Sequence, residues 1–559
     1  MRRWLYYLFL ICCPQALHAQ DILDRVISLD AHQRPLAQVL DSIGRRGQFE
    51  LSYNSTILRG DSLVSVSFRQ VTVRQALDRL LGKSYTYTER GNYLILLRAP
   101  PPETTYLLTG YVFDRNTGQK LVQASVYEKE QLQSTLTDEQ GYFRLRLKGR
   151  YMNPVLTVSR EWYADTAIVL RPGYDQALVI GLAPARVTEL SPVFISPMRV
   201  ERTRWGRFFI SSRERIQSLN IGSFFTNKPY QMSLLPGLGT HGKLSGQVTN
   251  SVSINVIGGY SAGIRGVELG GVFNIDKKSM GYVQAAGVFN LVGEKTTGFQ
   301  AAGVFNEGMD SVSGVQAAGV MNVASGRFAG AQLAGVVNWV HGPADGLLAA
   351  GIVNLVRGPV NGLQVAGLVN SCADTLRGGQ VSGFFNRAFV LKGVQIGILN
   401  MADTSEGYSI GLLDLVRRGG IHRLSLSMAP VTGFTLAYKS GNQKLYDILL
   451  FGYNPWSLFS AGYGLGKEIS FRKGWGLSEE LTARQLYNSH WNNLGTLYQL
   501  QPALTYRVDK RVRFWAGPSF SLHVYPTGLA PDVQRPDFPG FTWGSRTNAW
   551  VGASMGVDF

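Results

Sequence analysis

The chain of 559 residues contains 64 glycines and 11% aromatic residues but only 17% charged residues, a composition typical of β-rich proteins and not of helical cytosolic enzymes. No apolar run reaches the roughly 18 residues that a transmembrane helix needs, so the sequence predicts no such helix. The net charge of +17 is spread along an exported chain, which predicts surface charge and excludes nucleic acid as a partner.

Residues 1–19 have the pattern of an export signal. Arg2 and Arg3 form a charged start, an apolar stretch covers residues 4–13, and Ala19 ends a stretch typical of a cleavage site. Without this segment only Cys372 remains, so we expect no intramolecular disulfide. The sequence therefore predicts an exported mature chain beginning at Gln20.

Residues 20–98 predict a small α+β domain made of two β-α-β units. Apolar residues at helical spacing follow Pro35, which predicts a first helix there. Thr72 and Gln75 have the spacing of a capping box and predict the start of a second helix. Gly91 and Asn92 separate two short strand patterns and predict a closing hairpin.

The same segment resembles the short N-terminal domain of secretins and TonB-dependent receptors, the STN domain. The resemblance depends on LAQVL at residues 36–40, LSY at residues 51–53, VTVRQAL at residues 71–77 and YLIL at residues 93–96. In that family the domain is periplasmic and passes signals to an inner-membrane anti-sigma regulator, or helps to assemble a channel. The resemblance implies that residues 20–98 bind such a regulator or a TonB-type system.

A proline-rich linker is expected at residues 99–104, before a β-sandwich at residues 105–184. GYVFD at residues 110–114 and TDEQGYF at residues 137–143 resemble the carboxypeptidase regulatory-like domain. That module has no peptidase chemistry, so the resemblance implies a structural role. Residues 185–230 predict a connector of mixed character.

Residues 231–420 predict a β region that contains an internal repeat, with 16-residue units over residues 271–400. The unit reads G-x-Q-x-A-G-V-x-N, and two shorter copies at a spacing of fourteen residues end at Asn400 and Asp414. A fixed spacing of sixteen residues joins Asn274, Asn290, Asn306, Asn322, Asn338, Asn354, Asn370 and Asn386. A unit this short predicts one strand and one turn, stacked many times.

Two architectures satisfy this repeat. In the favoured one, each unit is one strand of a large outer-membrane β-barrel of about 18–20 strands. In the alternative, the repeats form a β-solenoid with stacked amides, followed by a smaller barrel of about 8–10 strands. GVQIGILN at residues 393–400 also resembles bacterial surface-repeat proteins, which implies a surface location and little about activity.

Residues 421–559 predict the strands of a C-terminal barrel. Even positions from Val512 to Val524 are all apolar, whereas most odd positions are polar. Long strands with one continuous apolar face are typical of barrels in lipid, and Phe559 resembles the terminal signal of outer-membrane proteins. The expected fold is therefore mainly β: this barrel, preceded by the small α+β domain and the sandwich.

Polar residues of the repeats and the last strands are candidates for the barrel lumen: Gln284, Asn290, Gln300, Asn306, Gln316, Asn322, Arg511, Arg513 and His523. Their amides have an alternative structural role, because they can bond neighbouring strands and turns. The sequence indicates no catalytic residue, cofactor or metal site. GYSAG at residues 259–263 matches a hydrolase motif, but it lacks the strand-to-helix context that the motif needs.

The expected function is non-enzymatic. The favoured hypothesis is an outer-membrane channel or receptor in contact with lipid, with residues 20–230 in the periplasm as a signalling or interaction region. The alternative is a structural or adhesive surface-repeat protein that binds partners or glycans.

Overall fold

The computed structural model describes residues 21–54, 58, 60–82, 85–98, 105–151, 153–185, 199–429, 431–455, 458–509, 511–527, 538, 540–542 and 546–559. The expected export signal and the linker at residues 99–104 lie outside the described residues. Strands make up 62% of the structure and helices 11%, which confirms the mainly β fold. Contacts divide the chain into two units, one up to Thr105 together with Lys148–Arg150 and the other containing the rest.

The first unit is an α+β domain, as the sequence predicts. Helices α1 and α2 bury Val39, Ile43 and Leu77 in one apolar core with the strands. The capping box is present, because Thr72 and Gln75 exchange side-chain and backbone hydrogen bonds at the start of α2. Its elements are η1 (Ile22–Asp24), β1 (Val26–Pro35), α1 (Leu36–Gly47), β2 (Glu50–Ser52), β3 (Leu63–Thr72), α2 (Val73–Leu81), β4 (Tyr85–Arg90) and β5 (Tyr93–Arg98).

The second unit begins with a β-sandwich. One sheet has the strand order β11-β10-β7-β8 and the other the order β12-β6-β9, and alternating residues such as Leu108, Val126 and Phe143 fill the space between them. The strands are β6 (Thr105–Asp114), β7 (Ser125–Glu128), β8 (Gln133–Leu136), β9 (Tyr142–Lys148), β10 (Val155–Ser159), β11 (Thr166–Val169) and β12 (Gln176–Leu182).

A short helical segment follows and covers the first turns of the repeat region. It contains η3 (Val200–Arg202), α3 (Arg204–Phe209) and α4 (Ser212–Asn220), with Thr203 and Ser211 as the side-chain caps of the two α-helices. The expected connector is therefore, from residue 199, a cap for the structure that follows.

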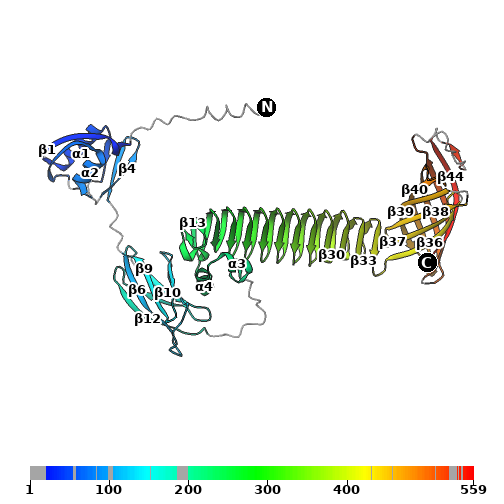
Figure 1. Cartoon of the computed structure of the whole chain (residues 1–559), viewed down its shortest axis with the longest axis horizontal. Helices are drawn as coiled ribbons and strands as arrows, with labels where there is room; N and C mark the ends of the chain where they lie inside the picture. Colours follow the sequence, from blue (N-terminus) through cyan, green and yellow to red (C-terminus); the bar gives the residue numbers. More distant parts are fainter. Residues whose placement is uncertain are drawn as a thin grey trace. The chain divides into compact units, whose positions relative to one another are not determined.

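The repeats form a parallel β-solenoid of about 10 turns (Figure 1). Equivalent residues sixteen apart are paired in register, for example Asn290 with Asn306 and Gln300 with Gln316. Most turns contribute a seven-residue strand to one sheet and a four-residue strand to the other. The first sheet contains β13 (Thr226–Leu235), β15 (Val248–Asn255), β17 (Gly263–Gly270), β19 (Met280–Ala286), β21 (Thr296–Ala302), β23 (Val312–Ala318), β25 (Phe328–Ala334), β27 (Ala344–Ala350), β29 (Val360–Ala366), β32 (Val394–Ile396) and β34 (Tyr408–Ile410).

The second sheet lies across the turn from the first. It contains β16 (Gly258–Ser261), β18 (Phe273–Asp276), β20 (Phe289–Val292), β22 (Phe305–Gly308), β24 (Met321–Ala324), β26 (Val337–Val340), β28 (Val353–Val356), β31 (Phe385–Leu391), β33 (Leu399–Ser405) and β35 (Leu413–Val416), while β30 (Val369–Ser382) contributes to both sheets. Two small elements, β14 (Leu238–Gly239) and η4 (Gly242–Gln247), complete the first turn.

The repeats are not strands of an 18–20-stranded barrel, which corrects the favoured interpretation in favour of its alternative. The physical reason is that barrel hairpins alternate between two kinds of turn, whereas a constant spacing places every asparagine under the next one. The first strand of the unit also bends at a glycine that repeats with the unit. Gly314 has φ +128°, and a Cβ there would lie 2.1 Å from the carbonyl oxygen of Gly298 in the turn below.

The chain ends in a closed antiparallel barrel of eight strands. Neighbouring strands pair in chain order, and β36 pairs with β44 to close the sheet, while β43 (Phe541–Thr542) adds to β44 alone. The eight strands are β36 (Ile421–Ala429), β37 (Gly433–Gly441), β38 (Tyr446–Asn454), β39 (Leu458–Ser470), β40 (Trp475–Tyr487), β41 (Asn493–Arg507), β42 (Arg513–Val524) and β44 (Thr547–Asp558), with η5 (Arg472–Gly474) before β40. Among the described residues, no helix is long and apolar enough to cross a membrane.

Candidate functional site

The repeated asparagines form one continuous hydrogen-bonded ladder inside the solenoid. In each rung the side-chain amide donates to the oxygen of the next asparagine, as from Asn306 Nδ2 to Asn322 Oδ1 at 3.0 Å. The same nitrogen donates to a backbone carbonyl of the following turn, here that of Ala317 at 2.8 Å. Asn322 is buried and the bond to Ala317 is partly buried, so the ladder satisfies side-chain and backbone groups that have little or no access to water.

The glutamines form a second ladder, which contains one gap. Gln300, Gln316 and Gln332 each donate to the glutamine of the preceding turn at 2.7–2.8 Å. The next position is Leu348, and the buried atoms on either side of it, Oε1 of Gln332 and Nε2 of Gln364, have no hydrogen-bond partner. The ladder then resumes with Gln380, which donates to Gln364.

We expect Leu348→Gln to stabilise the solenoid. Each orphaned buried polar atom costs about 1–3 kcal/mol, and a glutamine here can satisfy both, against about 1.5–3 kcal/mol for the lost leucine burial. The expected net gain is about 1–2 kcal/mol in the free energy of unfolding, measured by urea titration. Leu348→Ala is the control and should lose about 2–5 kcal/mol. A Leu348→Gln variant less stable than the parent protein would contradict the ladder interpretation.

Acidic residues occupy the start of the glutamine ladder. Gln284 Nε2 donates to Glu268 Oε2 and to Asp276 Oδ2, both at 2.8 Å. Burial, with the nearby charge of Glu268, raises the pKa of Asp276 well above its usual value. The shift has this direction because a second charge beside Glu268 would be buried away from water.

Aromatic side chains attach the helical segment to the outer face of the second sheet. Phe273, Phe289 and Phe305 stack on one another with ring centroids 5.0–5.3 Å apart. Trp205 and Phe209 of α3 pack on this stack with centroids 4.5–5.4 Å away. The helix therefore covers three consecutive turns of an outward apolar row.

A buried polar group fixes the same segment from its other side. Tyr260 donates to Glu201 Oε1 at 2.9 Å, and Lys277 donates to the carbonyl oxygen of Ser218 at 2.8 Å. Burial lowers the pKa of Lys277 to about 8, although Glu201 opposes this effect at 3.6 Å. The cap is thus joined to the solenoid by charge and by aromatic packing.

Charged side chains of opposite sign fill one end of the barrel interior. Arg513 lies 2.5 Å from Glu468 and 3.1 Å from Asp558, and its side chain is only 5% exposed. Arg423 donates to Glu468 at 2.7 Å, and Trp515 donates to Asp558 at 3.1 Å. Arg423, Lys439 and Arg513 face the acidic groups Glu468, Glu480 and Asp558, and the half-exposed Arg507 lies 4.0 Å from Glu468.

A second polar layer fills the interior nearer the other end of the barrel. Arg484 is buried and donates to Thr435 Oγ1 at 3.2 Å and to Gln499 Oε1 at 3.1 Å. Gly462 on β39 faces this guanidinium, and a Cβ at that position would lie 2.6 Å from the Arg484 Cβ. An eight-stranded barrel is just wide enough for its interior to be filled by side chains, and the described residues fill this one in that way.

The outer face of the barrel is apolar. Large hydrophobic side chains that are 43–69% exposed occur on all eight strands, among them Leu424, Leu426, Met428, Phe434, Leu436, Phe451, Ile469, Leu481, Leu504, Phe514, Phe520, Val551 and Met555. A contiguous exposed apolar surface of this extent is typical of contact with lipid or protein.

The last turns of the solenoid are hydrogen-bonded to the turn between β37 and β38. Asn442 donates to Ser405 Oγ and to the carbonyl oxygen of Gly407, both at 2.8 Å. Lys444 donates to the carbonyl oxygen of Glu406 at 2.7 Å. The asparagine ladder ends in Asp414, whose pKa is raised to about 9 by burial and by Asp447 of the barrel. The protonated carboxyl can therefore donate to Asp447 across the joint.

The predicted lumen residues separate into three groups. Gln284, Asn290, Gln300, Asn306, Gln316 and Asn322 lie in the solenoid ladders and not in a barrel lumen, because the repeats stack in parallel. Arg513 and His523 do lie inside the barrel, but at opposite ends of β42, and His523 packs against Tyr525 and Phe538. Arg511 is exposed just before β42.

The sequence interpretation missed the partners of Arg513. These are Glu468 on β39 and Asp558 on β44, and both lie at inward positions of their strands. An acidic residue at an inward-facing position of a barrel strand was the sequence feature that could have identified them. It does not show which strands meet, so it does not give the pairs.

Comparison with known proteins finds no match to this chain among family models, curated proteins or solved structures. The resemblances of residues 20–98, 105–184 and 393–400 therefore remain predictions.

Proposed function

We propose that the chain is a non-enzymatic outer-membrane protein whose barrel is an anchor and whose solenoid is a rigid periplasmic arm. The observation that carries this proposal is the hydrogen-bonded joint between the last solenoid turns and one end of the barrel. At that joint Asn442 and Lys444 bond the backbone and side chains of residues 405–407. The arm is therefore fixed to the barrel and not loosely tethered.

The barrel interior supports anchoring over transport. A channel needs a continuous water-filled path, whereas the charged cluster around Arg513 and the layer around Arg484 occupy the interior at two levels. Small eight-stranded barrels of this kind are filled by side chains. The apolar outer face satisfies the requirement for a closed sheet in lipid.

The connections of the barrel support a periplasmic position for the arm. β36 begins and β44 ends at the same end of the barrel, the end that contacts the solenoid. The connections at that end are short, residues 442–445, 471–474 and 508–512, whereas the longest connection, residues 525–546, lies at the opposite end. In outer-membrane barrels short turns face the periplasm and long loops face outward.

The arm sets a distance. About 10 turns at roughly 4.8 Å per turn make it about 48 Å long. The sandwich is attached to its first turns, because Asn220 donates to the carbonyl oxygen of Gln123 at 2.7 Å and Tyr127, Ile221 and Leu244 share an apolar cluster. We infer that the arm holds the sandwich away from the outer membrane, and that residues 20–98 bind an inner-membrane regulator or TonB-type partner.

Cysteine labelling on cells tests this proposal. Asn361→Cys places a thiol on the exposed outside of the solenoid, and His490→Cys places one in the turn after β40, at the end of the barrel opposite the solenoid. With a membrane-impermeant maleimide, we expect His490→Cys to react on intact cells and Asn361→Cys to react only after the outer membrane is permeabilised. Reaction of Asn361→Cys on intact cells would favour the surface-repeat alternative.

A further inference from the structure

The apolar row under α3 continues along the whole solenoid without a cover. In each turn, the two residues before the ladder asparagine are apolar and lie where the chain enters the second sheet. The first row contains Val320, Val336, Ile352, Leu368, Phe384 and Ile398, and the second contains the residue after each of these. We call these two rows the apolar double row.

The double row is an exposed apolar surface that continues the surface covered by α3. Val320, Ile352, Leu368, Phe384 and Ile398 are 40–52% exposed, although all are large and hydrophobic. In the second row, Phe273 and Phe289 of the first turns are 1% exposed because α3 covers them, whereas the residues at the same position beyond α3, from Met321 to Leu399, are only partly buried. The uncovered part is therefore the direct continuation of an interface that the chain itself already uses.

We propose that a second copy of the chain covers the apolar double row, so that two solenoids pack side by side through the same face. The spacing of the rows favours this occupant. Any partner must present apolar groups every ~4.8 Å over many turns, and a second solenoid has that spacing built in. A helix lying along the rows has a pitch of 5.4 Å, so over five turns its side chains drift by about 3 Å out of register.

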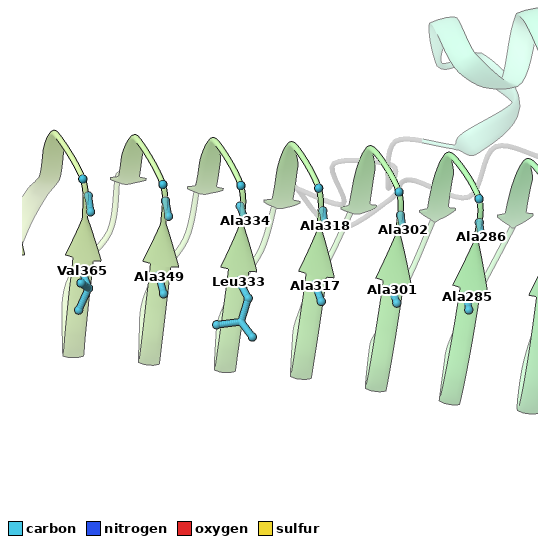
Figure 2. A pocket seen from close by; sticks show the side chains of 18 of the residues that line it. Ala285, Ala286, Ala301, Ala302, Ala317, Ala318, Leu333, Ala334, Ala349 and Val365 are labelled. Carbon is cyan, nitrogen blue, oxygen red and sulfur yellow. The ribbon is translucent and has the colours of Figure 1, made fainter. Parts of the chain in front are cut away.

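The residues that directly precede the double row in each turn form a surface of different shape. A shallow groove of about 1040 Å³ runs there along Ala-Ala-Gly positions such as Ala301, Ala302 and Gly303 (Figure 2). Its lining side chains are mostly single methyl groups, whereas the double row presents valine, isoleucine, leucine and phenylalanine. Interdigitation of large side chains between two sheets therefore favours the double row as the contact.

The double row supplies part of the area that a stable dimer needs. Full burial of a valine-to-phenylalanine side chain corresponds to about 60–120 Å² at 25 cal/mol per Å². With the exposed fractions above, the five exposed residues of the first row offer on the order of 140–280 Å² per copy, to which the partly buried second row adds. A stable interface takes ~800 Å² per partner, so the neighbouring outward residues Trp339 and Leu355 must join the contact.

The orientation follows from the proposed function, on which this step depends. If both barrels are anchored in one membrane, the two solenoids run parallel, and the dyad axis lies along them. Each residue of the double row then meets its own counterpart at the same height. An antiparallel dimer has a perpendicular dyad, at which only one turn meets itself.

Disulfide trapping in the full-length protein distinguishes these arrangements. Ile352→Cys and Phe384→Cys lie two turns apart on the double row, and Asn361→Cys on the opposite sheet is the matched control. We expect both double-row variants to form disulfide-linked dimers under mild oxidation and the control to remain monomeric. Cross-linking of Asn361→Cys as efficiently as of Ile352→Cys would overturn the proposal, because it would indicate random collision.

The oligomeric state in detergent, measured by light scattering, is the second test. We expect the parent protein and Asn361→Arg to be dimers. For Leu368→Arg we expect the dimer dissociation constant to rise at least tenfold, because the substitution buries an unpaired charge in the contact. The heat-dependent gel mobility of the barrel reports separately whether the anchor is folded. A monomeric parent protein with a folded barrel overturns the dimer alone. If only one of the two double-row variants forms a disulfide-linked dimer, the two solenoids are not parallel and the two barrels are not anchored in one membrane. The double row would still be the contact surface.

Discussion

Replacing Asn338 by leucine is expected to lower the free energy of unfolding of the solenoid by about 3 kcal/mol. Asn338 Nδ2 donates to Asn354 Oδ1 at 2.9 Å and to the carbonyl oxygen of Ala349 at 2.8 Å, and its own Oδ1 accepts from Asn322 at 3.0 Å. The variant leaves several of these buried groups without a partner, at about 1–3 kcal/mol each. Part of this cost is offset by the burial of the leucine side chain.

The measurement is a urea titration of the full chain followed by circular dichroism. Asn361→Leu is the matched control, because Asn361 is exposed and donates only to Asp345 Oδ1, so its loss should change stability by no more than ~0.5 kcal/mol. Equal effects of the two substitutions would show that the ladder contributes nothing beyond general amide contacts. Because each turn contacts only its neighbours, the defect should also lower cooperativity and separate two unfolding steps.

The glutamine ladder tolerates the loss of one of its residues better than the asparagine ladder does, for a physical reason. An asparagine rung bonds both its neighbour and a backbone carbonyl of the next turn, so its loss orphans the backbone as well. A glutamine rung such as Gln316 bonds chiefly the glutamines above and below it. This explains why the asparagine spacing is unbroken while leucine replaces the glutamine at position 348.

Local signals were enough to predict the N-terminal α+β domain. The capping box at Thr72 and the helix that follows Pro35 depend on residues within one turn of each other, and the structure has both. The repeat was also evident from Asn274 to Asn386, but its spacing alone does not say whether neighbouring units pair in parallel or antiparallel fashion. That choice depends on whether successive turns bend the chain in the same sense, which the spacing does not encode.

The interior of the barrel shows where sequence analysis stops. The alternation of polar and apolar positions along β42 predicted that Arg513 and His523 face inward, and the structure places both inside the barrel. Their neighbours come from strands far away in sequence: Glu468 is on β39, and Phe538 follows β42. The alternation along a strand predicts on which side of the sheet a side chain lies. Its contact partners also depend on how the strands are paired and in which register the barrel closes.

The second large effect is expected from Arg513→Met, which should destabilise the barrel by about 3–5 kcal/mol. The substitution keeps much of the side-chain volume but removes the guanidinium between Glu468 and Asp558, at 2.5 and 3.1 Å. Both carboxylates are at most 2% exposed, so they would lose a cation without gaining water. Breaking a buried ion pair by removing one partner costs about this much. Arg423 still contacts Glu468 and Lys439 still lies 3.6 Å from Asp558, so the expected loss is toward the lower end of this range.

A matched control and a double substitution make this prediction decisive. Arg511→Met removes the same charge two residues earlier, at an exposed position, and should change the free energy of unfolding by no more than ~0.5 kcal/mol. Adding Glu468→Gln to Arg513→Met should recover part of the loss, because it removes one negative charge from a cluster that has lost a positive one. If Arg513→Met were as stable as Arg511→Met, water would reach the cluster. An aqueous path of that kind would restore the channel hypothesis, and single-channel conductance of the parent protein would then have to be nonzero.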